Sequence, residues 1–324
     1  MGTKIRGDKM IKVNFFINKD IDYKVIQTIK EAMDNDGNFI TKVNYNEETK
    51  TKKFDDSDYL ILSSIYNIQS AHPKICYIEY GPLIKYDLQY PPIKDATKIW
   101  RYFVGDSFNY NFIHNKLGID DSKIIKSGHP RYDAVIKGTK GKSENNTILY
   151  MPTVQISFGE KSHYSTFQQW ADDVLYACSE LDIKLVIKGH PFLFRYLQPK
   201  NFGSYRNVIY TETPNYIDLF NSSKLAIIDG SGIMLEYLHT HKPIILLISD
   251  RAKSNPTIRE FDKSCYTPTN RNGLIHLISD ILNGVDLLKQ GREKLLIDNF
   301  YNPKGNTGYM IKEYIKTDYN KEKK

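Results

Sequence analysis

The sequence predicts an α/β protein with two domains, each built around a parallel β-sheet of the Rossmann type. Short apolar runs rich in β-branched residues alternate with segments of helical spacing, which is the pattern of repeated strand–helix units. A chain of 324 residues is long for a single hydrophobic core, so two domains are expected. Ligands of such folds bind beyond the carboxyl ends of the strands, and we expect the two sheets to face each other across a cleft.

The first half of the chain contains alternating strand and helix patterns. The expected strands are Ile11–Ile17, Tyr59–Ser63, Lys74–Ile78, Trp100–Val104 and Ile124–Ser127. The expected helices are Ile21–Met33, with apolar residues at helical spacing, and Ser107–Leu117. The polar stretch 44–58 is expected to be a loop, and residues 1–9 are expected to be a leader outside the fold.

The second half repeats the same alternation. Its expected strands are Thr147–Met151, Lys184–Lys188, Val208–Tyr210, Leu225–Ile228 and Ile244–Ile248. Its expected helices are Tyr164–Leu181, Tyr216–Asn221, Ile233–His239, Leu274–Leu282, Leu287–Phe300 and Asn306–Ile315. The polar, glycine-containing stretch Lys137–Asn146 lacks apolar periodicity and predicts a linker. We therefore expect domains over residues 10–136 and 147–285, with C-terminal helices over 286–318 that pack across both.

Composition and charge restrict the class of partner. The net charge is +7, which favours phosphate-rich partners and allows peripheral contact with an anionic membrane. Basic residues are scattered without interleaved aromatics, so nucleic-acid binding is not expected. The chain has neither a long apolar run nor a signal-peptide pattern, and we expect it to be cytoplasmic. Cys76, Cys178 and Cys265 are far apart, which predicts reduced thiols and no metal site.

Residues 224–249 contain the most informative motif, a strand, a turn, a short helix and a second strand. The turn exposes backbone N–H groups at a helix N-terminus, where a phosphate or pyrophosphate would be stabilised. Gly230, Ser231 and Gly232 are therefore candidate phosphate-binding residues. Glu236 follows about one helical turn later and could accept hydrogen bonds from ribose hydroxyls. The alternative is a simple tight turn followed by a solvated glutamate.

Further candidates follow the ends of other expected strands. Glu79 could act as a general base at such a position, or it could cap a loop. His190 could stabilise charge on the donor phosphates, or it could cap the turn before the next proline. Arg131 offers a fork of donors that suits a phosphate and a structural carboxylate equally. His129 is expected to be structural.

Four blocks, in this order, are similar to one enzyme family. They are Ser127–Asp133, Ile148–Thr153, Lys188–Pro191 and Leu219–Pro243. Together they resemble the CDP-glycerol glycerophosphotransferases that build teichoic acids, which have the GT-B fold. Asn302–Gly308 is similar to the segment that precedes this family's closing helix. The resemblance spans residues 74–315, implies a donor-binding second domain, and adds Thr153 and Lys188 to the expected nucleotide and phosphate contacts.

One segment departs from the family pattern. The family has a Trp-His-Gly-Thr-Pro segment with a catalytic histidine, whereas this chain has Glu79–Leu83 at the matching place. Glu79 is therefore the expected base. The His-Pro block followed by a Ser/Gly-rich turn also resembles bacterial GT-B enzymes that use CMP-activated acidic sugars. The donor thus stays open between a CDP-linked polyol phosphate and a CMP-, CDP- or UDP-activated sugar.

The expected reaction is a transfer that needs neither a metal ion nor a cofactor. An acceptor hydroxyl, deprotonated by a base from the first half, attacks the activated phosphorus or anomeric carbon, while His190 and Ser231 hold the leaving nucleotide. The resemblance implies a glycopolymer of the cell surface, teichoic acid or capsule, or a lipid-linked molecule as acceptor. Two other classes stay open: a UDP-sugar epimerase, which has a similar Ser-Gly-Gly…Glu turn, and a non-catalytic nucleotide-binding module.

Overall fold

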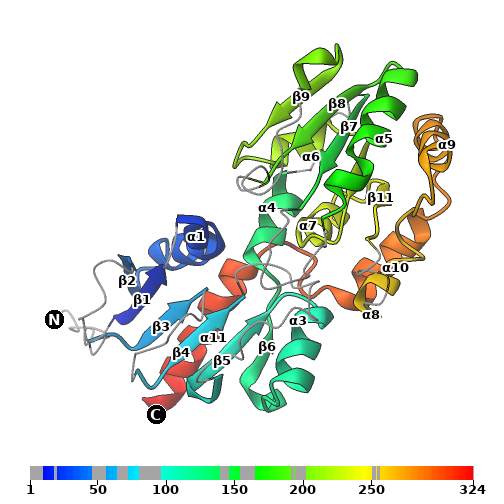
Figure 1. The fold of residues 1–324 in the computed structure, drawn as a ribbon. Coiled ribbons are helices and arrows are strands. Elements are labelled where there is room, and N and C mark those ends of the chain that lie inside the picture. Colours follow the sequence, from blue (N-terminus) through cyan, green and yellow to red (C-terminus); the bar gives the residue numbers. More distant parts are fainter. Residues whose placement is uncertain are drawn as a thin grey trace. The chain divides into compact units, whose positions relative to one another are not determined.

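The computed structural model describes residues 10–17, 20–45, 56–63, 72–79, 96–138, 146–153, 165–190, 193, 202–249, 253 and 256–323. The chain forms two compact units (Figure 1). It passes from the first unit to the second between Asp133 and Ala134, and it returns between Asn299 and Phe300.

The first unit contains a six-stranded sheet in which every pairing is parallel. The strand order is β2-β1-β3-β4-β5-β6. The strands are β1 (Ile11–Ile17), β2 (Phe39–Tyr45), β3 (Tyr59–Leu62), β4 (Ile75–Ile78), β5 (Ile99–Val104) and β6 (Ile124–Lys126). The sequence pattern did not predict β2, because this edge strand carries polar residues such as Lys42 and Asn44 among its apolar ones.

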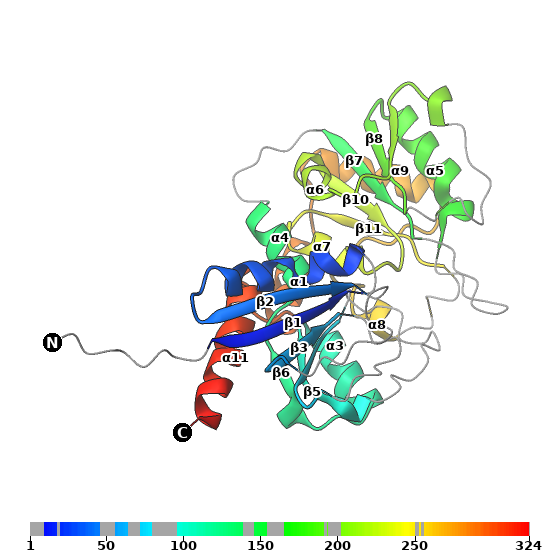
Figure 2. The same ribbon diagram turned by 90° about the vertical axis from the view of Figure 1, so that its left-hand side faces the viewer.

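Helices cover both faces of this sheet, so its central strands are apolar on both sides. Ile61 and Ile78 face the helices α1 (Asp20–Asp34) and α11 (Thr307–Glu322). Leu60 and Tyr77, one residue earlier in each strand, face the opposite layer, which contains Ile113. That layer is formed by α3 (Ser107–Asn111) and the π-helical turn Phe112–Lys116. The helices α1 and α11 contact each other and lie side by side in both views (Figures 1 and 2).

The start of α11 is held by a segment that lies more than 170 residues earlier in the chain. The backbone N–H and the hydroxyl of Thr307 each donate to the buried carboxylate of Asp133, at 2.7 Å. The Asn302 side chain donates to the carbonyl of Ser127 at 3.0 Å. Gly128 has a φ of +87°, and a Cβ there would lie 2.6 Å from the Thr307 hydroxyl. The blocks Ser127–Asp133 and Asn302–Gly308 therefore interlock within the first unit.

The second unit contains a five-stranded parallel sheet of order β11-β10-β7-β8-β9. The strands are β7 (Thr147–Met151), β8 (Lys184–Lys188), β9 (Val208–Thr211), β10 (Leu225–Ile228) and β11 (Ile244–Leu246). The helices are α5 (Phe167–Glu180), α6 (Ile217–Ser222), α7 (Ile233–Leu238), α8 (Pro256–Arg259), α9 (Arg271–Leu282) and α10 (Lys289–Asn299). The two parallel sheets with their helices confirm the predicted α/β fold class.

The helix α4 (Pro130–Gly138) carries the chain from the first unit into the second. The sequence pattern did not predict it, because a Gly-His-Pro turn and a glycine-containing polar stretch border it. Proline at the first helical position explains its start, since the missing N–H would be unsatisfied there in any case. Residues 139–145 of the predicted linker lie outside the described residues, α10 belongs to the second unit, and α11 belongs to the first.

We predict that Gly308 is required for the packing of α11 on α1. A Cβ at Gly308 would lie 2.3 Å from the carbonyl oxygen of Thr28, so Gly308→Ala should lower the free energy of unfolding by about 1–3 kcal/mol. Gly273 in α9 is the matched control, because a Cβ there meets only the Asn270 side chain, at 3.5 Å. Gly273→Ala should be neutral or stabilising by up to about 1 kcal/mol. Urea unfolding of both variants tests this, and equal changes would contradict it.

Candidate functional site

The predicted site residues follow the carboxyl ends of strands in both sheets. Because all pairings are parallel, the carboxyl ends of one sheet share one edge. In the first unit, Glu79 follows β4, and Arg131 lies in the first turn of α4, shortly after β6. In the second unit, Thr153, His190 and the Gly230–Gly232 turn follow the neighbouring strands β7, β8 and β10. Each unit therefore collects its own candidates at one edge.

Glu79 is held through both its side chain and its backbone. Its half-buried carboxylate accepts a hydrogen bond from the Tyr77 hydroxyl at 2.6 Å. Its carbonyl oxygen lies 2.7 Å from Nε2 of His129, which follows β6. His129 crosses the end of the intervening strand β5 to reach Glu79, and Gly105 makes room for it, since a Cβ at Gly105 would lie 2.5 Å from the His129 Cβ. The geometry thus fixes the position of the predicted base.

Both ring nitrogens of the buried His129 are hydrogen-bonded to backbone groups. Its Nδ1 accepts a hydrogen bond from the backbone N–H of Arg131 at 3.2 Å, so the proton resides on Nε2 and is donated to the Glu79 carbonyl. Burial, together with the nearby positive charge of Arg131, lowers the pKa of His129 from 6.5 to about 4, although the hydrogen bond to the Glu79 carbonyl acts in the opposite direction. Arg131 itself is half-buried.

In the second unit, the buried carboxylate of Asp229 connects the segment after β10 to the end of β7 and to the start of α5. Asp229 follows β10, is fully buried, and accepts from the backbone N–H of Thr153 at 2.8 and 3.0 Å to its two oxygens. It also accepts from the backbone N–H of Thr166, the residue that precedes α5, at 3.2 Å. Asp229 therefore ties the end of β7 and the start of α5 to the turn after β10.

The Gly230–Gly232 turn leads directly into the six-residue helix α7. Gly230 is buried, whereas Ser231 and Gly232 are half-buried. The backbone N–H of Ser231 donates to the Asp229 carbonyl at 2.5 Å, so this N–H is used inside the turn. The role of the turn in phosphate binding stays a prediction.

Glu236 lies in α7 and is fully buried. Its carboxylate accepts a hydrogen bond from the Tyr216 hydroxyl, which comes from the residue before α6. The Tyr216 ring packs against Phe220, which in turn contacts Tyr237 of α7. The Tyr216 hydroxyl therefore occupies one oxygen of the buried carboxylate. The predicted ribose contact is not tested by this geometry.

The end of β8 contributes Lys188 and His190, both half-buried. The Lys188 ammonium lies 3.3 Å from the Gly189 carbonyl. Gly189 permits the close approach of Tyr210 from β9, since a Cβ at Gly189 would lie 2.2 Å from the Tyr210 hydroxyl. That hydroxyl donates to Glu212 at 2.7 Å. The aromatic ring of Tyr210 therefore lies beside the segment that presents His190.

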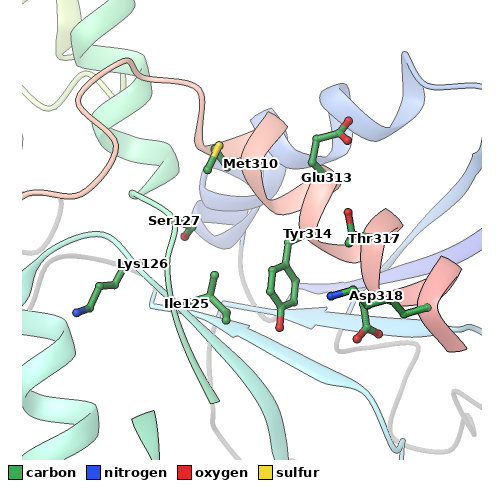
Figure 3. A pocket seen from close by; sticks show the side chains of 9 residues that line it. Ile125, Lys126, Ser127, Met310, Glu313, Tyr314, Thr317 and Asp318 are labelled. Atoms are coloured by element: carbon green, nitrogen blue, oxygen red, sulfur yellow. The ribbon is translucent and has the colours of Figure 1, made fainter. Parts of the chain in front are cut away.

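The cavity found in the first unit is lined by none of the predicted site residues. A cavity of about 350 Å³ lies beside β6 and α11 in the first unit (Figure 3). Its Asp318 is already bonded to Tyr59 and Lys74 at 2.7 Å, which makes it part of the packing of α11. Within the described ranges, no group of three or more His, Cys, Asp and Glu residues could hold a metal ion. No helix in the described part of the chain is long and apolar enough to cross a membrane.

A family model for CDP-glycerol:poly(glycerophosphate) glycerophosphotransferases matches residues 89–271, which is more than half of the chain. The chain belongs to this glycerophosphotransferase family. The family match covers every strand of the second unit and begins after the Glu79–Leu83 segment. Residues 80–83 of that segment lie outside the described residues, so Glu79 is the one residue of the segment that the structure describes.

Solved structures agree with the GT-B fold expected of this glycerophosphotransferase family. The wall teichoic acid polymerase TagF is 16% identical, with a TM-score of 0.66 over 97% of this chain and 90% of that chain. A TagF variant determined with CDPG has a TM-score of 0.69, 16% identity, and coverage of 98% and 90%. A UDP-GlcNAc 2-epimerase from Methanocaldococcus jannaschii is 13% identical, with a TM-score of 0.63 over 95% of this chain and 100% of that chain. No curated protein sequence matches this glycerophosphotransferase.

The structure adds residues to the candidate site that the sequence pattern did not single out. Asp229 and Tyr216 contact the predicted residues Thr153 and Glu236 directly. No local signal could reveal these contacts, since their partners lie 76 and 20 residues away in the sequence. The sequence shows only that Asp229 follows an expected strand, which does not identify its partners.

We predict that acid destabilises this glycerophosphotransferase partly through His129. Since the folded-state pKa of about 4 is below the unfolded value of 6.5, the unfolded chain binds more protons between these values. The stability is therefore full above pH 6.5 and is lost as the pH falls toward 4, with a slope of at most about 1.4 kcal/mol per pH unit. His129→Gln keeps an N–H for the Glu79 carbonyl but cannot titrate. Its unfolding free energy should vary less between pH 4.5 and 6.5, and equal slopes for both proteins would contradict the assignment.

Proposed function

We propose that this chain transfers a polyol phosphate, specifically glycerol phosphate, from a CDP-linked donor to a hydroxyl group of a growing cell-surface glycopolymer. The observation that carries the proposal is the family match over residues 89–271, which includes the whole sheet of the second unit. The likeness to TagF over nearly the full length of both chains supports it. The CDPG in one of those TagF structures supports a CDP-linked donor rather than a CMP-linked sugar.

The proposed step is a displacement at the phosphorus atom that carries the glycerol. The acceptor oxygen forms the new bond to phosphorus, the bond to the bridging pyrophosphate oxygen breaks, and CMP leaves with the electron pair. Glu79 takes the proton of the acceptor hydroxyl. Its fixed position, with the Tyr77 hydroxyl at 2.6 Å and the His129 ring on its backbone, supports this role, because a base must be held in place.

The carboxyl edge of the second unit is the proposed donor site. His190 and the Ser231 hydroxyl would stabilise the charge that develops on the leaving CMP. Thr153, Lys188 and the glycines of the turn would contact the donor phosphates. Their place at the ends of three neighbouring strands supports this assignment. Glu236 would meet the ribose if Tyr216 moves, and Arg131 would contribute a further phosphate contact from its own unit.

Peripheral contact with an anionic membrane is part of the proposal, because a lipid-linked acceptor would bring the transferase to a membrane surface. The net charge of +7 supports it. Pelleting with anionic vesicles at low salt, lost at high salt, is the expected behaviour. Pelleting with neutral vesicles to the same extent would contradict an electrostatic contact.

The likeness to UDP-GlcNAc 2-epimerases supports a second candidate, an enzyme that acts on a UDP-linked sugar without an acceptor. The two candidate activities differ in the substrate they use and in whether the reaction needs an acceptor. Glycerophosphotransfer predicts CMP release from CDP-glycerol that depends on an acceptor with terminal glycerol phosphate. Epimerisation of UDP-GlcNAc without any acceptor, combined with no CMP release, would favour the second candidate.

We predict that Glu79→Gln lowers turnover about 10²–10⁴-fold with little change in the donor KM, because it removes the proton acceptor and keeps the shape. Glu212→Gln is the matched control, since Glu212 also accepts from a tyrosine two residues earlier, Tyr210, at 2.7 Å. The control should retain turnover, whereas His190→Ala should raise the donor KM and lower kcat together.

These rates are measured as CMP release in the presence of EDTA, since the proposed transfer needs no metal ion. Near-normal turnover of Glu79→Gln would remove Glu79 from the role of base. Turnover that appears only after addition of Mg²⁺ or Mn²⁺ would contradict the metal-independent mechanism.

A further inference from the structure

We propose that Asp229 is a positioning residue for the donor phosphates, which holds Thr153 and the Gly230–Gly232 turn in the geometry that binds them. The inference rests on the transfer proposed above. It assigns to Asp229 a role that acts through its neighbours, without contact between its own carboxylate and the substrate. Three observations carry it: the burial of Asp229, the identity of its hydrogen-bond donors, and its place between two candidate phosphate contacts.

Burial makes the Asp229 carboxylate costly unless it is fully used. The side chain is fully buried. An ionised carboxylate in that position destabilises the fold unless hydrogen bonds from the protein replace those it made to water. Here the donors are the backbone N–H groups of Thr153 and Thr166. The pairing of β7 with β10 brings the first donor close to the turn after β10, and the Asp229 side chain bonds both donors there. A residue that served the core alone would be cheaper as an apolar side chain.

One of the donors also lies at the start of a long helix. Thr166 directly precedes α5, a helix of 14 residues, so Asp229 accepts from one donor at the positive end of that helix. The negative charge of Asp229 is thereby offset, which reduces its repulsion of an anionic ligand nearby.

Asp229 also connects the two candidate contacts, which follow the paired strands β7 and β10. Its side chain bonds to the Thr153 backbone at 2.8 Å, while its own carbonyl accepts from the Ser231 backbone at 2.5 Å. One residue therefore fixes a group after β7 and a group after β10 at once. Because catalytic geometry tolerates little displacement, loosening this connection should weaken the binding of the donor phosphates.

The test is Asp229→Asn, which keeps the shape but offers one acceptor oxygen and one amide N–H in place of two acceptor oxygens. The amide would face a backbone N–H, so one bond is lost. We expect the donor KM to rise about tenfold, the KM for the acceptor to stay unchanged, and hydrogen exchange at the Thr153 and Thr166 amides to accelerate. A merely structural defect would lower kcat through a smaller active fraction and leave the donor KM as it is.

The matched control is Asp133→Asn in the first unit. Asp133 is equally buried and also accepts a backbone N–H, but it holds the start of α11. This variant should lose thermal stability to a similar degree and keep the wild-type donor KM. An unchanged donor KM in Asp229→Asn, or the same rise in both variants, would overturn the positioning role. Failure of the wild-type protein to release CMP from CDP-glycerol would instead contradict the proposed transfer itself.

Discussion

Parallel strand pairing is the constraint on which the rest of this structure depends. Every pairing in both sheets is parallel, so all strands of one sheet end at the same edge and each connection returns over a face. This arrangement buries the strands on both sides and leaves their carboxyl ends as the place where loops and helix starts converge. Thr153, His190 and Ser231 lie at the carboxyl edge of the second sheet because the topology requires it, and Glu79 lies at the carboxyl edge of the first sheet for the same reason.

Buried carboxylates bond together chain segments that the fold brings close to one another. Asp106, Asp133 and Asp229 are almost completely buried, and each accepts at least one backbone N–H from a nearby or distant segment. Asp106 precedes α3, caps its first turn, and also accepts from the Tyr132 hydroxyl at 2.6 Å. Asp133 lies in α4 and accepts from Thr307, the first residue of α11. A buried charge of this kind is strongly destabilising when its partner is lost. The three aspartates therefore hold the segments that donate to them in defined positions. Two of these residues, Asp133 and Asp229, lie in the blocks of the sequence that resemble the glycerophosphotransferase family.

Local sequence patterns predicted what depends on local physics. The apolar residues of Ile11–Ile17 and Lys184–Lys188 predicted strands with the observed bounds, because most of the residues in these strands are apolar and buried in the sheets. The patterns missed β2, whose edge position tolerates polar residues, and α4, whose proline start resembles a turn. They also missed the partners of Asp229, which lie 76 and 63 residues away in the sequence. Contacts at that separation are set by the sheet order, which residue spacing does not encode.

The account depends most on the claim that the carboxyl edge of the second unit binds a cytidine nucleotide. A ligand that binds only the folded protein raises its melting temperature by mass action, so CMP, CDP, UDP and GDP can be compared at equal concentration. The account predicts the largest increase for CDP and a clearly smaller increase for UDP and GDP, with the CDP increase reduced in a Ser231→Ala variant. An increase with UDP that equals or exceeds the one with CDP, or no increase with any of the four nucleotides, would contradict it.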